Sequence, residues 1–136
     1  MSDDELYRQG MRARREVLGD AHVDRALANA SDFTAPWQEF ITRHAWGAVW
    51  TRDGLDRRTR SVITLTALTA LGRENEIAMH VRAALGNGLT QEEIGELLMH
   101  TAVYAGVPAA NAAFAIAQSV FDEAAGSSSG SSETAT

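Results

Sequence analysis

Hydrophobic positions along the chain recur at helical spacing. β-Branched residues are scattered, and no period-two alternation of strand length occurs. Capping residues divide the sequence into helices predicted over 3–18, 20–30, 34–50, 57–71, 74–85, 90–105 and 108–124. The pattern therefore predicts an all-α bundle of about six to seven helices.

The helix ends are signalled by local capping residues. Short polar side chains that accept a hydrogen bond favour helix starts, and glycine favours stops because it adopts a positive φ without strain. Proline fits the first helical turn, so Ala35-Pro36 after Thr34 indicates a start. The predicted N-caps are Asp3 or Asp4, Asp20, Thr34, Asp56 and Thr90 (in a capping box with Glu93), and the predicted stops are Gly19, Gly72 and Gly106.

The length of 136 residues fits one domain. We expect a single all-α domain over 1–125. The remaining segment, 126–136, reads GSSSGSSETAT and has no side chains that could form a core. Such a Gly/Ser-rich segment is predicted to be disordered.

The last two helices are apolar on more than one side. The main stripe of 90–105 is Ile94, Leu97, Leu98, Thr101 and Ala105, whereas Met99, Val103 and Tyr104 face elsewhere. The final helix is rich in alanine and also carries phenylalanine and isoleucine. A helix that is apolar nearly all round is buried on all sides. In so short a chain this favours a homo-oligomer, with a compact monomer around a tight alanine seam as the alternative.

Composition excludes several classes of chemistry. The chain has no cysteine, and all 12 basic residues are arginine. Disulfide, thiolate-metal and lysine Schiff-base chemistry are therefore excluded. The net charge of −6 argues against a nucleic-acid partner. No apolar run has the roughly 20 residues of a membrane helix, and the acidic N-terminus is unlike a signal peptide, so we expect a cytoplasmic protein.

One segment places a cation, a carboxylate, an imidazole and an amide on one predicted helix face. At 100° per residue, Arg73, Glu76, His80 and Asn87 fall within about 40° of His80. Glu76 and His80 at i,i+4 spacing can form a hydrogen bond that orients the imidazole as a general acid. The alternative is a solvated face with a routine Glu–His pair. No third ligand for a metal is evident, so no metal is expected.

Four arginines lie within the nine positions 52–60 of this acidic chain. Such a cluster can bind a carboxylate or phosphate bidentately, although salt bridges between helices are the alternative. Arg57 and Arg60 share one side of their helix. Trp46 and Trp50 precede the cluster and either line a pocket or pack in the core. Helical spacing also predicts core positions for Phe33, Trp37, Phe40 and His44.

Several long strings resemble the carboxymuconolactone decarboxylase family. They are RREVLGDAHVDR (14–25), WTRDGLDRRTRS (50–61), LGRENEIAMHVRAAL (71–85), NGLTQEEI (87–94) and HTAVYAGVPAANAAF (100–114). The resemblance covers roughly residues 6–123 and implies a fold like alkyl hydroperoxidase D, assembled as trimers or hexamers. Redox members of that superfamily carry Cys-x-x-Cys-x-x-x-His on this helix. Here the cysteine positions are Arg73 and Glu76, and only His80 survives.

The resemblance implies cofactor-free decarboxylation of 4-carboxymuconolactone, a dicarboxylate lactone, to β-ketoadipate enol-lactone and CO2 in protocatechuate catabolism. On this hypothesis His80 donates a proton and Glu76 orients it. Arg73, with one or more of Arg52, Arg57 and Arg60, binds the substrate carboxylates or the oxyanion, and Trp46 or Trp50 forms a wall of the site. The alternatives are a non-catalytic oligomeric relative that binds a small acid, and an isomerase or lactone hydrolase on the same scaffold.

Overall fold

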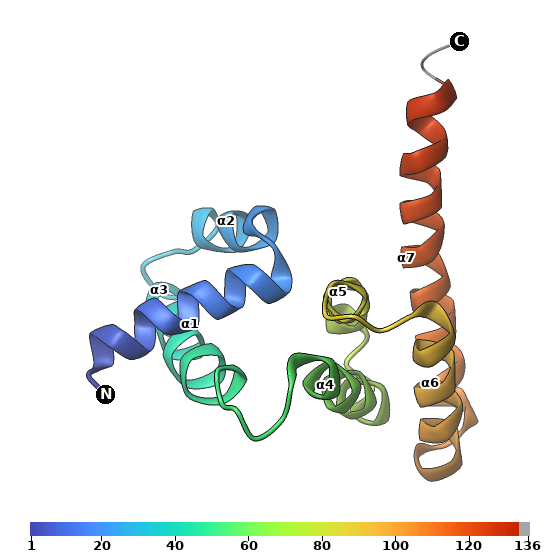
Figure 1. Ribbon diagram of the computed structural model, residues 1–136, viewed down its shortest axis with the longest axis horizontal. Helices are drawn as coiled ribbons and strands as arrows, with labels where there is room; N and C mark the ends of the chain where they lie inside the picture. The colour runs from blue at the N-terminus through green and yellow to red at the C-terminus, as the bar shows by residue number, and fades with distance from the viewer. Residues whose placement is uncertain (134–136) are drawn as a thin grey trace. The chain divides into compact units, whose positions relative to one another are not determined.

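The structure is a computed structural model that describes the backbone of residues 1–133 and the side chains of residues 1–126. Within that part of the chain every regular element is helical, which confirms the predicted all-α class (Figure 1). The chain divides into two compact units, residues 1–60 and 61–136, which are described separately. None of the described helices is long and apolar enough to span a bilayer.

Two expectations about domain organisation stay predictions. One is the single domain over 1–125. The other is the disorder of 126–136, which lies almost wholly outside the residues whose side chains are described.

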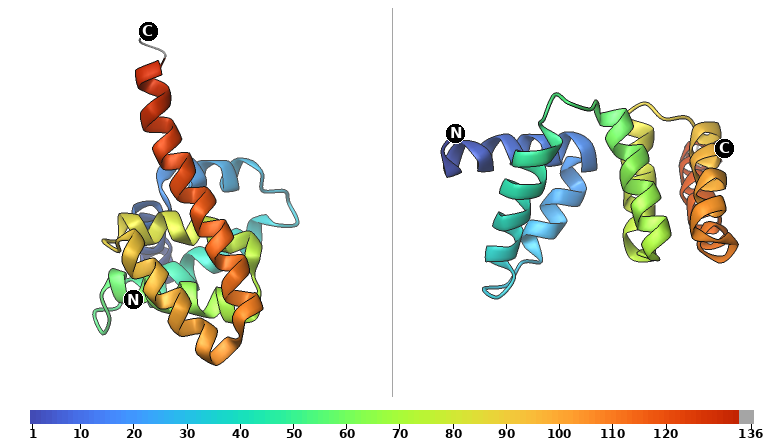
Figure 2. Two further views of the ribbon diagram at one scale, coloured as in Figure 1. Left: turned by 90° about the vertical axis from the view of Figure 1, so that its right-hand side faces the viewer. Right: turned by 90° about the horizontal axis from the view of Figure 1, so that it is seen from below.

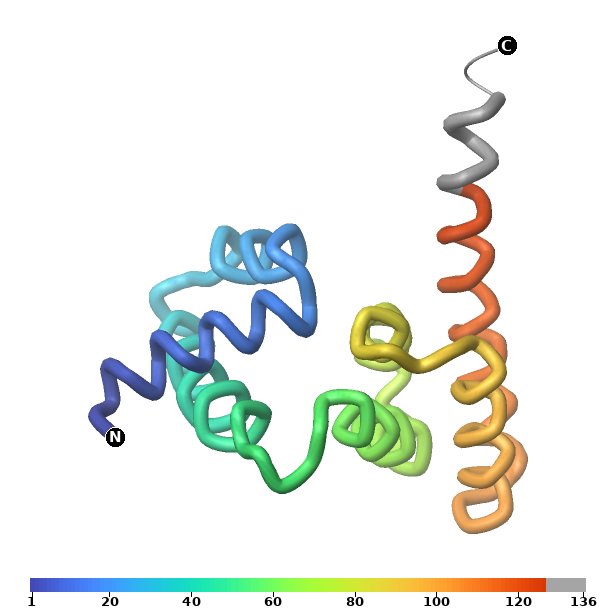
Figure 3. Tube along the Cα trace, in the orientation of Figure 1, coloured from blue at the N-terminus to red at the C-terminus, as the bar shows by residue number. Residues whose placement is uncertain are grey.

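Unit 1 consists of four helical elements and the start of a fifth. α1 (Asp3–Leu18) is followed by α2 (Asp20–Ala28), α3 (Ala35–Ile41) and the π-helix η1 (Thr42–Trp50). α4 (Arg57–Leu71) then begins and continues into unit 2. α1 packs against η1, and the Cα trace shows how closely the two backbones approach (Figure 3).

Two glycines make this close approach possible. A Cβ atom added to Gly10 of α1 would lie 1.9 Å from the carbonyl oxygen of Thr42 and 2.8 Å from the backbone nitrogen of Gly47. A Cβ atom added to Gly47 would lie 2.4 Å from the carbonyl oxygen of Leu6. Because backbone atoms occupy these positions, no side chain of any size fits there.

A buried arginine reinforces the same contact. Arg14 of α1 is only 3% exposed, and its guanidinium donates hydrogen bonds to Thr42 Oγ1 (3.1 Å) and Gln38 Oε1 (2.8 Å). Burial lowers the pKa of Arg14 by desolvation, yet a guanidinium keeps its charge in proteins. In the described part of the chain its hydrogen-bond partners are neutral, so a positive charge lies inside unit 1.

The helix predicted over 34–50 is in fact α3 followed by η1. The buried residues of η1 are Thr42, Trp46 and Gly47. The predicted core positions Phe33, Trp37, Phe40 and His44 were wrong, because all four are exposed, with Phe33 at 90%. Phe33 lies in the turn before α3, and no residue of α3 is buried. Three of the rings contact one another: Trp37 stacks on Phe40 at 5.7 Å, and Phe40 lies 4.7 Å from His44.

Unit 2 is built from the rest of α4 with α5 (Glu74–Gly86), α6 (Gln91–Ala105) and α7 (Val107–Glu133). α5 and α6 both pack against α7, and Figure 2 shows α6 alongside α7. The core consists of aliphatic side chains from these helices and from the segment between α5 and α6, which contributes Leu89: Leu65, Ile77, Val81, Ala84, Leu89, Ile94, Leu97, Leu98, Ala113, Ala117 and Val120.

Most of the predicted stripe of α6 is confirmed. Ile94, Leu97, Leu98 and Thr101 are buried, whereas Ala105 is exposed. Met99, Val103 and Tyr104 face away from the core, and Tyr104 is 81% exposed. The side chains of Met99, Val103 and Tyr104 therefore form an exposed, largely apolar surface on α6, outside the core of unit 2.

The capping signals were mostly correct. The capping box of Thr90 and Glu93 forms in both directions, and Gly19, Gly72 and Gly106 follow helix ends with positive φ. Two start signals were wrong, and a third was correct in its position only. Ser2 caps α1 in place of Asp3 or Asp4, and Gly19 stands at the N-cap of α2 in place of Asp20. Thr34 occupies its predicted position, but its hydroxyl accepts from the backbone of Ser31.

The glycine contact gives a stability prediction. Gly10→Ala should destabilise the protein by about 3 kcal/mol or more, because the new methyl group meets rigid backbone atoms. Gly86→Ala is the matched control: Gly86 is the last residue of α5, and a Cβ there meets nothing within 4 Å. The control should be neutral or stabilising by up to about 1 kcal/mol. Urea unfolding of the three proteins measures the difference, and equal effects of the two variants would contradict the close contact.

Candidate active site

The predicted catalytic face lies at α5, but only part of it is helical. Glu76 and His80 lie within α5, whereas Arg73 is its N-cap residue (φ −87°, ψ 66°) and Asn87 is its C-cap residue. The helix predicted over 74–85 is confirmed to within one residue, and the shared face of the four side chains stays a prediction.

His80 lies at the edge of the unit 2 core. Its side chain is half-buried, and its Nδ1 atom is buried. Its neighbours Ile77 and Val81 are each 1% exposed and fix the rotation of α5. His80 thus combines a buried ring nitrogen with a partly exposed ring, as a proton donor requires if it must reach a substrate.

The predicted hydrogen bond between Glu76 and His80 is not formed. Glu76 is exposed, and its carboxylate makes no hydrogen bond or ion pair within the described residues. The i,i+4 spacing permits such a pair, but an exposed carboxylate loses hydration and side-chain freedom by forming it. Arg73 at the N-cap is exposed as well.

A hydrogen bond between α4 and the end of α5 was missed by the sequence analysis. Asn87 Nδ2 donates to Oγ of Ser61 over 2.9 Å, and Ser61 is 1% exposed. Asn87 and Ser61 are 26 residues apart, so no local pattern in the sequence could predict their hydrogen bond.

In unit 1 the two tryptophans have different surroundings. Trp46 and Trp50 stack with ring centroids 5.0 Å apart. Trp46 is 7% exposed and belongs to the interior of the unit. Trp50 is half-buried and lines a cavity of about 360 Å³ together with Arg52 and Arg57. Of the two, only Trp50 is a wall of this cavity.

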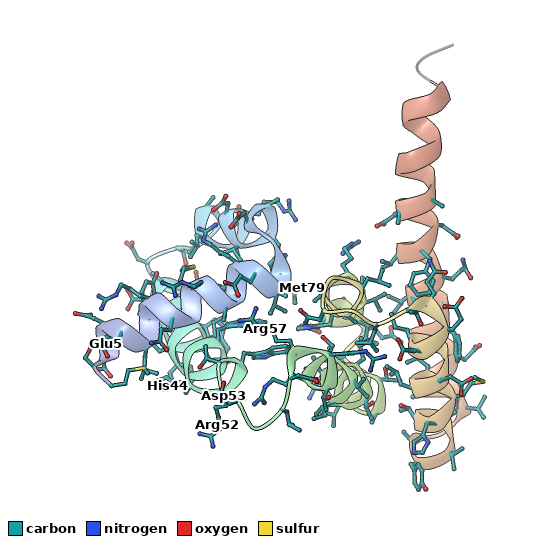
Figure 4. The ribbon with its side chains drawn as sticks, viewed as in Figure 1. Glu5, His44, Arg52, Asp53, Arg57 and Met79 are labelled. Atoms are coloured by element: carbon teal, nitrogen blue, oxygen red, sulfur yellow. The ribbon has the colours of Figure 1, made fainter. Side chains whose placement is uncertain are left out.

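The turn after η1 carries Arg52 and Asp53 and leads into α4 (Figure 4). Asp56 caps α4 by accepting a 2.7 Å hydrogen bond from the backbone N–H of Thr59, as predicted. Hydrogen bonds from Thr59, together with the charge of Arg58, lower the pKa of the Asp56 carboxyl. The cap fixes where α4 begins and therefore where Arg57 lies.

The arginines of this region have separate partners. Arg60 donates to the carbonyl oxygen of Arg52 over 3.1 Å and so holds the turn closed. Arg57 pairs with Glu16 of α1 over 2.5 Å. Asp53 and Asp56 also line the cavity beside Trp50, so its walls carry both signs of charge.

The described part of the chain contains no preformed metal site. No group of three histidine, aspartate or glutamate side chains is arranged there to hold an ion. The polar groups available to a substrate near the predicted site are the imidazole of His80 in unit 2 and guanidinium groups in both units.

Comparison with known proteins identifies close relatives. The profile of the carboxymuconolactone decarboxylase family matches residues 35–119, which is more than half of the chain. A 4-carboxymuconolactone decarboxylase of Acinetobacter baylyi is 51% identical over 90% of this chain and 92% of its own length. A nitrosuccinic acid decarboxylase of Metarhizium robertsii is 42% identical over 90% of this chain and 88% of its own. A 4-carboxymuconolactone decarboxylase sequence of Pseudomonas putida is 55% identical over 35% of this chain and 98% of its own.

Proposed function

The chain belongs to the carboxymuconolactone decarboxylase family, and we propose that it is a carboxy-lyase that converts 4-carboxymuconolactone to β-ketoadipate enol-lactone and CO2. The observation that carries this proposal is the 51% identity with the Acinetobacter baylyi enzyme over 90% of the chain. A role in protocatechuate catabolism and a cytoplasmic location are parts of the same proposal.

The substrate itself supplies the electron sink for this reaction. The departing carboxylate is bonded to the ring carbon that is γ to the lactone carbonyl, across a C=C bond. When the C–C bond to CO2 breaks, its electron pair moves through that double bond onto the carbonyl oxygen and gives a furan-like dienolate. Protonation of the carbon α to the carbonyl then yields the enol-lactone. The protein has to bind two carboxylates, stabilise the oxyanion and deliver one proton.

His80 is our candidate for the proton donor, because it is the half-buried imidazole of α5. Glu76, one turn earlier on α5, is proposed to orient the imidazole when substrate is bound. Arg73, exposed at the N-cap, is proposed to stabilise the oxyanion or a carboxylate.

The residues of unit 1 are proposed to bind and enclose the substrate. Arg52 and Arg57 are the candidates for carboxylate binding, and Trp50 forms an apolar wall of their cavity. Arg60 would contribute through the turn that it holds, and Trp46 through its stack on Trp50.

The Metarhizium robertsii relative supports a second candidate substrate. The name nitrosuccinic acid denotes a four-carbon diacid with a nitro group, and that enzyme is 42% identical to this chain. In both acids the carbon that loses CO2 also carries a CH2COO⁻ arm, and an adjacent group accepts the electron pair. We place the lactone first because its relative has the higher identity and the greater coverage.

A homo-oligomer, as a trimer or hexamer, is also part of the proposal. Exposed aromatic side chains on α3 and exposed apolar side chains on α6 support it, because monomers rarely leave such contiguous groups in water. Light scattering coupled to size-exclusion chromatography should give a mass of three or six times 14.6 kDa. A species of 14.6 kDa at micromolar concentration would contradict it.

The activity is tested directly by a coupled assay. 4-Carboxymuconolactone is generated in situ from 3-carboxymuconate with a lactonising enzyme, and CO2 and enol-lactone are followed with EDTA present. We expect rapid CO2 release that EDTA does not change. Nitrosuccinate is assayed in parallel. Turnover of nitrosuccinate alone would replace the first candidate, and ligand-dependent thermal stabilisation without any turnover would favour the non-catalytic binding alternative.

The role of His80 is tested by substitution. His80→Ala should lower kcat by about 10²–10⁴-fold, the contribution usual for a general acid. His22→Ala on α2 is the control and should retain wild-type kcat. Thermal unfolding shows whether each variant is folded. A folded His80→Ala enzyme with wild-type kcat would remove His80 from the mechanism.

A further inference from the structure

A second cavity in unit 1 has a composition suited to one carboxylate. It encloses about 200 Å³ and is lined by Gln9, Arg12, Ala13, Thr51 and Arg57. The first three residues lie on α1, Thr51 follows η1, and Arg57 is the first residue of α4. Two guanidinium groups and an amide therefore face one small space, and no acidic side chain lines it.

The two arginines are differently held. Arg57 is fixed by its ion pair with Glu16, which engages one of its nitrogens. A guanidinium has five N–H donors, so others remain for a ligand. Arg12 is exposed, and within the described residues its guanidinium has no hydrogen bond or ion pair. Thr51 donates its hydroxyl proton to the carbonyl of Gly47, which fixes that wall.

The neighbouring cavity beside Trp50 differs in charge. Its walls include the carboxylates of Asp53 and Asp56, which repel an anion. The cavity of Arg12 and Arg57 has no carboxylate among its lining residues, and the buried charge of Arg14 lies on the same helix. Of the two cavities, this one is the stronger anion site.

The proposed reaction decides which carboxylate belongs there. The leaving carboxylate loses its charge as CO2 forms, so a strong ion pair with it would stabilise the ground state more than the transition state and slow the reaction. The carboxylate of the CH2COO⁻ arm keeps its charge throughout, and binding it costs nothing in the chemical step. A pair of arginines is therefore suited to the retained arm.

We infer that Arg12, with Arg57, forms the subsite that binds the retained carboxymethyl group of the substrate, and that Arg12 is a specificity-determining residue. The inference rests on the proposed decarboxylase function. A subsite for this arm would serve 4-carboxymuconolactone and nitrosuccinate alike, since both carry it.

Paired substrates and a matched control variant test this subsite. Arg12→Gln removes the cavity charge, and Arg8→Gln removes the same charge one turn earlier on α1, from an exposed residue that does not line the cavity. With 4-carboxymuconolactone, Arg12→Gln should raise KM about ten- to hundredfold, as expected for loss of a charged hydrogen-bond pair, with a smaller effect on kcat. Arg8→Gln should match wild type.

An analogue without the arm, 5-oxo-2,5-dihydrofuran-2-carboxylate, separates binding of the two carboxylates. Its kcat/KM should be low in wild type and unchanged by Arg12→Gln. Equal losses with both substrates, or equal behaviour of Arg12→Gln and Arg8→Gln in an active enzyme, would overturn the inference.

A binding measurement separates failure of this inference from failure of the proposed function. Muconolactone carries the CH2COO⁻ arm and lacks the carboxylate that leaves, so it reports on the subsite without turnover. Calorimetry should show binding to wild type and to Arg8→Gln, and binding at least about tenfold weaker to Arg12→Gln. If the protein decarboxylates neither acid yet shows this pattern, the subsite stands and the proposed reaction fails. Equal affinity of all three proteins in an active enzyme overturns the subsite.

Discussion

The backbone contact between α1 and η1 is the constraint on which unit 1 depends. Packed helices are usually held about 8–10 Å apart by their side chains. At Gly10 and Gly47 no side chain intervenes, and the position of a Cβ atom on either residue is already taken by backbone of the other helix. This contact fixes the rotation of α1 about its axis. It thereby directs Arg14 into the interior toward Thr42 and leaves Arg12 at the cavity with Arg57.

The π-helix allows both Thr42 and Gly47 to face α1. Thr42 and Gly47 are five residues apart and both are buried. On an α-helix residues five apart are separated by about 140° and could not both face α1. The wider turn of a π-helix, with i→i+5 hydrogen bonds, brings them to one side. The exposed aromatic residues Phe33, Trp37 and Phe40 precede the π-helix, and no residue of α3 is buried.

Local signals in the sequence predicted most of the fold, and contacts between distant residues were not predictable. The capping box at Thr90 and Glu93 and the glycine stops depend on neighbours within one turn, so the sequence is sufficient to find them. Helical period also predicted most of the core stripe of α6, whereas the role of His80 stays a prediction. The π-helix has no such signature in the sequence. Asn87 with Ser61, and Arg12 with Arg57, are brought together only by packing.

The proposed reaction requires that the two carboxylates of the substrate are bound with different strength. Binding every carboxylate of a diacid tightly would lower KM and leave the barrier unchanged or higher, because the charge to be lost would be stabilised before the reaction. A protein improves the rate by binding the lasting charge firmly and the vanishing charge weakly. Unit 1 contains two such environments: a cavity at Arg12 and Arg57 with no acidic residue in its lining, and a mixed one at Trp50 where Asp53 and Asp56 offset the neighbouring arginines. On the proposed reaction, these two acids would keep that surface from holding an anion as strongly as its arginines alone would.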